Sequence, residues 1–199
     1  MRLRKAIALG IVLAGLYALV IEPYWIEVTH PTLHARGVTA SLRVLHLTDL
    51  HGVDLGRREK SVLHIMQEEK PDLIVITGDT SDRGTFGSYR EFLASLHAPL
   101  GVFAVKGNWE HWAPAADEAT TLESAGVTLL VDEARRLREG LWIVGFDDET
   151  AGAPNVERAM HSVPSDAVTI ALMHSPSLCD PSATPGCGTA GTVLALVPS

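Results

Sequence analysis

The sequence predicts an α/β domain with a largely parallel sheet, preceded by a separate apolar segment. Three observations support this fold class. Short apolar runs alternate with amphipathic segments between residues 38 and 177, as they do where helices connect parallel strands. Polar residues directly follow several of the apolar runs. The whole chain has 199 residues, which is enough for one domain with an appendage.

The N-terminal segment, residues 1–28, is predicted to be a membrane anchor. Three basic residues in "MRLRK" precede an uncharged stretch at 6–21. A spanning helix needs about 20 residues, and Tyr24 and Trp25 can extend the stretch into the interface. Basic residues ahead of the span favour a cytoplasmic N-terminus, which puts the domain on the extracytoplasmic side. The alternative is a cleaved signal peptide, although no small-x-small cleavage site follows the apolar stretch.

The first half of the domain contains three strand–helix repeats. The segments "SLRVLHLTD" and "DLIVITGD" are apolar runs typical of buried strands. Pro71 ends the helix between them, and a later helix has Pro in its first turn and Gly at its end. We expect strands at 41–49, 72–79 and 100–108, and helices at 57–70, 88–97 and 114–126.

The second half is expected to contain more strands and one short helix. The segment "AVTIALMHS" is another buried strand by the same criteria. We expect strands at 127–132, 134–139, 141–148 and 167–175, and a helix at 155–163. Residues 178–199 form an atypical tail rich in small residues, Pro and Gly, as linkers are.

The charge of the chain excludes one class of function. The net charge is −8, whereas nonspecific nucleic-acid binding needs clustered Lys and Arg. We therefore expect no nucleic-acid partner. The first strand is followed by neither GxGxxG nor GxxxxGK, which argues against a nucleotide-binding domain with a Gly-rich phosphate loop.

Polar side chains collect where the predicted strands end. Ligands of such sheets bind beyond the carboxyl ends of the strands, so these side chains should share one edge. Oxygen and imidazole donors without thiolate suit Mn, Fe or Zn, and a carboxylate on a central strand can bridge two such ions. The candidate ligands are Asp49, His51, Asp79, Asn108 and His174.

Four motifs in this region resemble the calcineurin-like metallophosphoesterases, and most of all a bacterial membrane-anchored subgroup. "LTDLHG", "ITGDTSD", "KGNWE" and "LMHSPS" occur in the order of that family's signature, and the resemblance covers residues 38–177. It implies an α/β/β/α sandwich and hydrolysis of a phosphoester by water activated at two divalent metal ions, without a covalent enzyme intermediate.

The resemblance also implies a role for each ligand. Asp49 and His51 would bind the first metal, Asp79 would bridge both, and Asn108 and His174 would bind the second. Asp82 and Glu110 are not expected to bind a metal themselves, but to hold neighbouring metal ligands in position.

One departure from the family pattern concerns the residue after Asn108. Family members usually carry a His there, which assists the leaving oxygen, whereas this chain has Trp109. An indole N–H donates a hydrogen bond but does not transfer a proton at useful pH. Either His111 substitutes as the catalytic residue, or the leaving group needs little help, as in a phosphodiester. Trp109 could also be a core residue.

A second departure concerns the family's closing GHxH segment, which does not follow His174. Each metal then keeps three protein ligands, and the C-terminal strands of the sandwich are expected to be incomplete, as in a truncated member. The main hypothesis is a metallophosphoesterase acting on a phospholipid head group or lipid-linked sugar phosphate, because the anchor holds the site near the bilayer. The alternative is an impaired or inactive member that acts as a binding protein.

Overall fold

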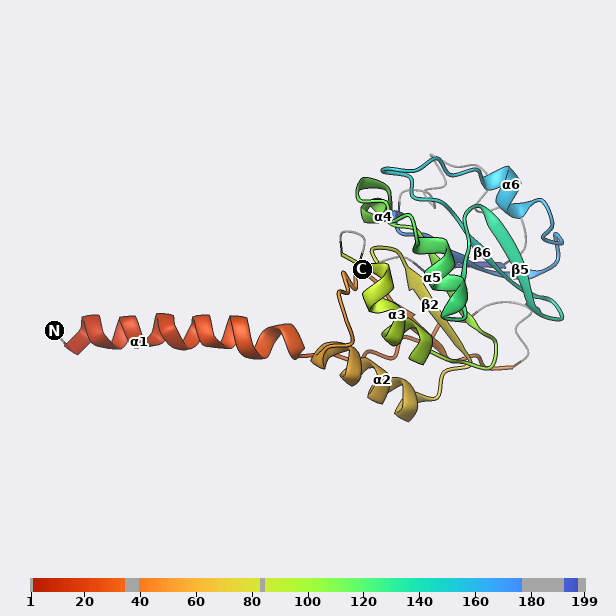
Figure 1. Cartoon of the computed structure of the whole chain (residues 1–199). Coiled ribbons are helices and arrows are strands. Elements are labelled where there is room, and N and C mark those ends of the chain that lie inside the picture. Colours follow the sequence, from red (N-terminus) through yellow and green to blue (C-terminus); the bar gives the residue numbers. More distant parts are fainter. Residues whose placement is uncertain (1, 35–39, 83–84, 177–191, 197–199) are drawn as a thin grey trace.

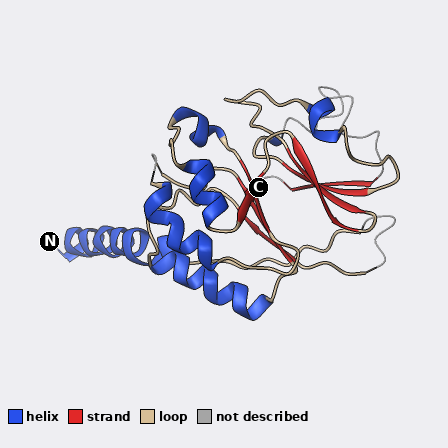
Figure 2. Cartoon of the chain, turned by 45° about the vertical axis from the view of Figure 1, so that its right-hand side comes forward, coloured by secondary structure: helices blue, strands red, loops and turns tan. Residues whose placement is uncertain are grey.

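The computed structural model describes residues 2–34, 40–82, 85–176 and 192–196. Two four-stranded sheets lie face to face; several helices cover the outer face of the first, and, in the described part of the chain, one short helix lies on the outer face of the second (Figure 2). This arrangement confirms the α/β/β/α sandwich that the resemblance implies.

The first sheet is entirely parallel, in the order β1-β2-β3-β4. Helices follow its first three strands and pack on one face of the sheet, as Figure 1 shows for α2, α3 and α5. The strands are β1 (Val44–Leu47), β2 (Leu73–Thr77), β3 (Val102–Val105) and β4 (Val127–Leu129). The helices are α2 (Arg57–Glu69), α3 (Phe86–Ser95) and α5 (Glu118–Ser124).

The second sheet has the order β5-β6-β7-β8. Its first pair is antiparallel and the other two pairs are parallel. Its elements are β5 (Glu133–Arg138), β6 (Leu141–Gly145), α6 (Val156–Met160), β7 (Val168–Leu172) and β8 (Thr192–Leu196). No strand was predicted within 178–199, so β8 corrects the sequence analysis; residues 178–191 and 197–199 lie outside the described part of the chain.

Strand β2 shows how the layers are held together. Its residues are all buried. Because the side chains of a strand alternate between its two faces, they pack into two different hydrophobic cores. Ile74 and Ile76 pack with the helices, whereas Leu73 and Val75 pack against the second sheet. A continuous apolar sequence is therefore required here, as predicted for a strand covered on both faces.

The strands are shorter than predicted because their last residues turn out of the sheet. Gly78 and Asp79 have φ of 89° and 50°, and Asp49 has φ of 50°, all in the left-handed region that a strand cannot contain. The predicted strand 100–108 is wrong beyond Val105, because Asn108–Trp112 forms a short helix, α4.

The N-terminal segment is helical, and only its last turn, at Tyr24, reaches the domain. It comprises α1 (Arg2–Leu16), the π-helical turn η1 (Tyr17–Ile21) and the 3₁₀ turn η2 (Glu22–Tyr24). Within it, Leu3–Tyr24 is long and apolar enough to cross a membrane, although a signal sequence meets the same criteria. Figure 1 shows α1 projecting away from both sheets, with no part of the domain packed on it.

Candidate metal centre

The five candidate ligands gather at the carboxyl edge of the two sheets. Asp49 and His51 follow β1, Asp79 follows β2, and Asn108 begins α4 just after β3. His174 follows β7 and so approaches from the second sheet. The site therefore forms only when the two sheets pack together. Residues 44–175 must fold as one unit for this to happen.

Asp79 lies at the centre of this group, and its two carboxylate oxygens face different partners. Its Oδ2 is 3.5 Å from His51 Nε2, and Asp49, His51 and Asp79 offer donor atoms within 4.8 Å of one another. Its Oδ1 is 3.8 Å from His174 Nε2, which in turn lies 2.9 Å from Asn108 Oδ1. A carboxylate placed in this way is suited to bridge two donor sets.

The contacts of His174 point to a cation. Its Nδ1 lies 2.8 Å from the carbonyl oxygen of Thr77, and a ring N–H directed at that carbonyl leaves a lone pair on Nε2 of the neutral ring. The amide oxygen of Asn108, 2.9 Å from Nε2, is also an acceptor. Two acceptors at this separation repel each other, and a cation that takes both as ligands would remove this repulsion. The donor set therefore fits a metal ion.

The backbone at the site is strained. Asp49, His51 and Asp79 all have positive φ, at 50°, 42° and 50°. Non-glycine residues in this region are uncommon and cost about 1–3 kcal/mol each, and they cluster at functional sites. Backbone hydrogen bonds hold two of these turns together, from Asp49 N to Gly78 O and from His51 N to Asp79 O.

Two glycines let the ligand loops approach each other. A Cβ on Gly78 would lie 2.6 Å from Gly107 N and 2.8 Å from His174 Nδ1, and a Cβ on Gly107 would lie 2.7 Å from Asp79 N. Side chains do not fit at such distances, since the neighbouring atoms are backbone atoms or belong to the Asp79 and His174 side chains. Glycine is required at both positions to bring Asp79 next to Asn108 and His174.

Glu110 ties the same two loops together. Its buried carboxylate accepts hydrogen bonds from the backbone N–H groups of Asp79, Thr80 and Gly107, at 2.9, 2.7 and 2.8 Å. It therefore contacts the backbone of the loops rather than the side chains of the candidate ligands. The bond from Gly107 also caps the first turn of α4.

Trp109 is half-buried at the site and is not one of the core residues. Its backbone N–H donates to Asp79 Oδ1 at 2.9 Å, and its indole N–H donates to Asp82 at 3.2 Å. Its ring and the His51 ring meet nearly at right angles, with centroids 5.5 Å apart. Asp82 thus positions Trp109, and Trp109 packs against a candidate ligand.

His111 pairs with a residue that the sequence analysis did not include among the site residues. Its Nε2 donates to Asp147 Oδ1 at 2.7 Å. Burial alone would raise the pKa of Asp147, but hydrogen bonds from the Ala153 N–H and from His111 outweigh it, so this pKa is lowered. Asp147 follows β6 at the same edge as the ligands, which is the one sequence signal that could have identified it.

Comparison with known proteins gives a family match. Residues 42–185 match the family model described as calcineurin-like phosphoesterase, which confirms the resemblance seen in the motifs. An uncharacterized metallophosphoesterase of Aquifex aeolicus (strain VF5) is 32% identical over 143 residues, covering 69% of this chain and 54% of the relative. The uncharacterized metallophosphoesterase YkuE of Bacillus subtilis (strain 168) is 28% identical over 192 residues, covering 86% of this chain and 66% of YkuE.

A third relative is named for a substrate. The UDP-2,3-diacylglucosamine pyrophosphatase LpxG of Chlamydia trachomatis is 33% identical over 109 residues, covering 50% of this chain and 33% of LpxG. In each of these pairs, the chain spans between about one third and two thirds of the relative's own length.

Proposed function

Since this chain belongs to the calcineurin-like phosphoesterase family, we propose that it is a metal-dependent phosphoester hydrolase with a site for two divalent cations. The observation that carries this proposal is the position of Asp79, whose two oxygens face separate sets of donors. Asp49, His51 and Asp79 would hold one ion, and Asp79, Asn108 and His174 the other. Their oxygen and imidazole donors suit Mn, Fe or Zn.

The residues of the chain would bind and orient the substrate around this centre. When bound, such ions supply Lewis acidity, which neutralises phosphate charge and activates water for attack on phosphorus. The Thr77 carbonyl fixes the ring of His174, and Glu110 fixes the loop that carries Asp79. Trp109 packs against the ring of His51 and would help to hold it in position.

The first test is whether turnover depends on metal. The full chain in a non-ionic detergent should hydrolyse bis(p-nitrophenyl) phosphate, and a chelator should reduce the rate to the uncatalysed background. Added Mn²⁺, Fe²⁺ or Zn²⁺ should restore it, and calorimetry should give two ions per chain. Turnover that survives the chelator would contradict the proposal, whereas tight metal binding without turnover would favour a binding protein of the same fold.

His111 and Asp147 are proposed to assist the leaving group. Asp147 Oδ1 accepts a hydrogen bond from His111 Nε2 at 2.7 Å, which fixes the ring and leaves Nδ1 as the atom that would give a proton to the leaving oxygen. General acids contribute about 10²–10⁴-fold, most where the leaving oxygen is basic. His111→Gln should therefore slow an alkyl phosphodiester at least about 100-fold, but a p-nitrophenyl diester by less than about tenfold.

The comparison of the two substrates separates an acid from a structural residue. Asp147→Asn should show the same selective loss for the alkyl ester, because it removes the carboxylate that accepts from His111 Nε2 and orients the ring. His97→Gln, a change of an exposed histidine elsewhere, should leave both rates unchanged. Equal losses for the two esters in the His111 variant would mean that this residue supports the structure only.

The membrane is proposed to determine where the protein acts. The helix Leu3–Tyr24 is long and apolar enough to span a bilayer, and the basic residues before it favour an extracytoplasmic domain. LpxG, a relative, is named for a diacylated sugar nucleotide. We therefore propose a lipid-linked phosphoester as the substrate class, which the anchor would bring to the metal centre.

A further inference from the structure

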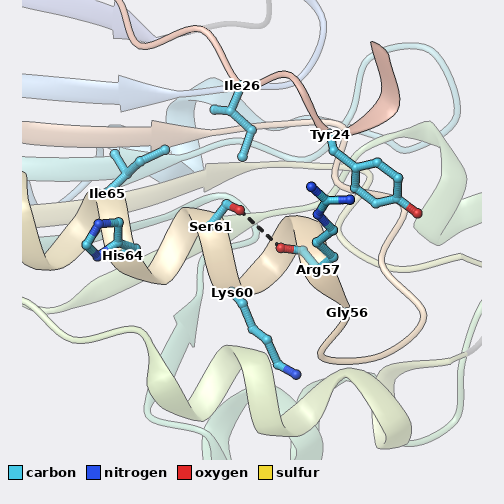
Figure 3. A pocket seen from close by; sticks show the side chains of 8 residues that line it. All are labelled: Tyr24, Ile26, Gly56, Arg57, Lys60, Ser61, His64 and Ile65. Atoms are coloured by element: carbon cyan, nitrogen blue, oxygen red, sulfur yellow. Dashed lines mark hydrogen bonds between the residues drawn. The ribbon is translucent and has the colours of Figure 1, made fainter. Parts of the chain in front are cut away.

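A cavity of about 680 Å³ lies between η2 and helix α2, away from the candidate metal centre. Its walls include Tyr24 and Ile26 from the segment after α1, and Arg57, Lys60 and Ile65 from α2 (Figure 3). It is a shallow depression, open to solvent over most of its extent, rather than an enclosed pocket. None of the five candidate metal ligands lines it.

The cavity combines two cationic side chains with an apolar wall. Figure 3 shows Arg57 pointing toward Tyr24, and its guanidinium carbon lies 4.9 Å from the centroid of that ring. Lys60 extends from the next turn of α2, and Figure 3 shows it pointing away from Tyr24 and Ile26. Among the described residues, neither side chain has a carboxylate within ion-pairing distance. Arg58 differs, since it pairs with the buried Glu59 at 2.8 Å.

The cavity lies next to the end of the apolar helix, which brings it close to lipid phosphates. The apolar helix Leu3–Tyr24 ends at Tyr24, and Tyr24 is itself part of the cavity wall. If this helix spans a bilayer, the cavity lies at the level of the lipid head groups, where aromatic rings settle. Trp25, the next residue, is 70% exposed, as expected for an interfacial anchor.

We propose that this cavity binds the head group of an anionic phospholipid from the membrane that carries the anchor. Arg57 contacts the phosphate, Lys60 adds positive charge at the edge of the cavity, and Tyr24, Ile26 and Ile65 contact the glycerol and the upper part of the acyl chains. The inference rests on the proposed membrane anchoring and is independent of the proposed hydrolysis. Bound lipid would fix the orientation of the domain, because α2 packs directly on the first sheet.

The test measures lipid retention on the full chain in a mild non-ionic detergent. Dioleoyl phosphatidylglycerol is titrated in, and bound lipid is counted by native mass spectrometry, with dioleoyl phosphatidylcholine as the neutral comparison. The wild-type chain should retain one phosphatidylglycerol in preference to phosphatidylcholine. The double variant Arg57→Gln with Lys60→Gln should bind phosphatidylglycerol at least about tenfold more weakly, since each basic side chain near a membrane surface adds attraction for anionic lipid.

A matched control removes the same two charges elsewhere. Lys70 lies at the other end of α2, about 15 Å from Lys60 by helical rise, and Arg136 is exposed on β5. The variant Lys70→Gln with Arg136→Gln should retain phosphatidylglycerol like the wild type. Equal retention of both lipids by the wild type, or wild-type retention by the cavity variant, would overturn the proposal. The titration is repeated on the Asp79→Asn variant, which should retain phosphatidylglycerol like the wild type, because lipid binding requires no catalysis.

Discussion

Asp79→Asn should lower phosphoester hydrolysis by at least about a hundredfold and abolish binding of the second metal ion. Losing a residue that merely supports a metal ligand costs about 10–100-fold, and Asp79 is the proposed ligand of both ions. The amide keeps one oxygen and loses the charge that both donor sets face. Turnover of a chromogenic diester and metal content by calorimetry measure the two effects.

The fold should survive this substitution, which makes the result interpretable. Asn tolerates the left-handed φ of position 79, and its amide oxygen can still accept the Trp109 N–H. Asp166→Asn is the matched control, because Asp166 is exposed and precedes β7 at the opposite edge of its sheet. If Asp79→Asn bound two ions and turned over like the wild type, the proposed bridging role would be wrong.

Glu110→Ala should lower the free energy of unfolding by about 3 kcal/mol. The change leaves the N–H groups of Asp79, Thr80 and Gly107 without their acceptor, and each buried unpaired donor costs about 1–3 kcal/mol. The substitution also removes a buried charge, whose desolvation is unfavourable, and this offsets part of the loss in stability. Denaturant unfolding of the full chain in detergent, followed by tryptophan fluorescence, measures the difference.

Two further variants test this explanation. Glu110→Gln keeps an acceptor oxygen in place and should lose roughly half as much stability or less. Glu123→Ala, an exposed position on α5, should change the free energy of unfolding by less than about 0.5 kcal/mol. A loss below about 1 kcal/mol for Glu110→Ala would mean that water or other groups replace the carboxylate.

The buried strands and their polar ends could be predicted from the sequence because each signal is local. An apolar run such as residues 73–77 identifies β2, and the polar residue after it must lie at the carboxyl edge. The same argument places Asp49 and His174 at that edge. The assignment of each residue to an ion, and the division into segments 1–28, 38–177 and 178–199, stay predictions.

The rest depends on contacts between distant segments, which no local pattern encodes. His111 and Asp147 are 36 residues apart and come from the two different sheets' loops, so their pairing follows only from the packing of the sandwich. Helix α4 was missed because the apolar run before it favoured a longer strand, although Glu110 three residues after Gly107 is half of a capping box. Strand β8 was missed because small residues, Pro and Gly surround it.

The close contact of the loops at Gly78 and Gly107 has a consequence for natural variation. Every codon change that replaces glycine adds at least a methyl group, and neither position has room for one. Conservative exchange, which most buried positions tolerate, is therefore impossible at these two. Missense alleles at either codon should be as damaging as loss of a proposed metal ligand, even though the glycines have no side chain that could bind a metal.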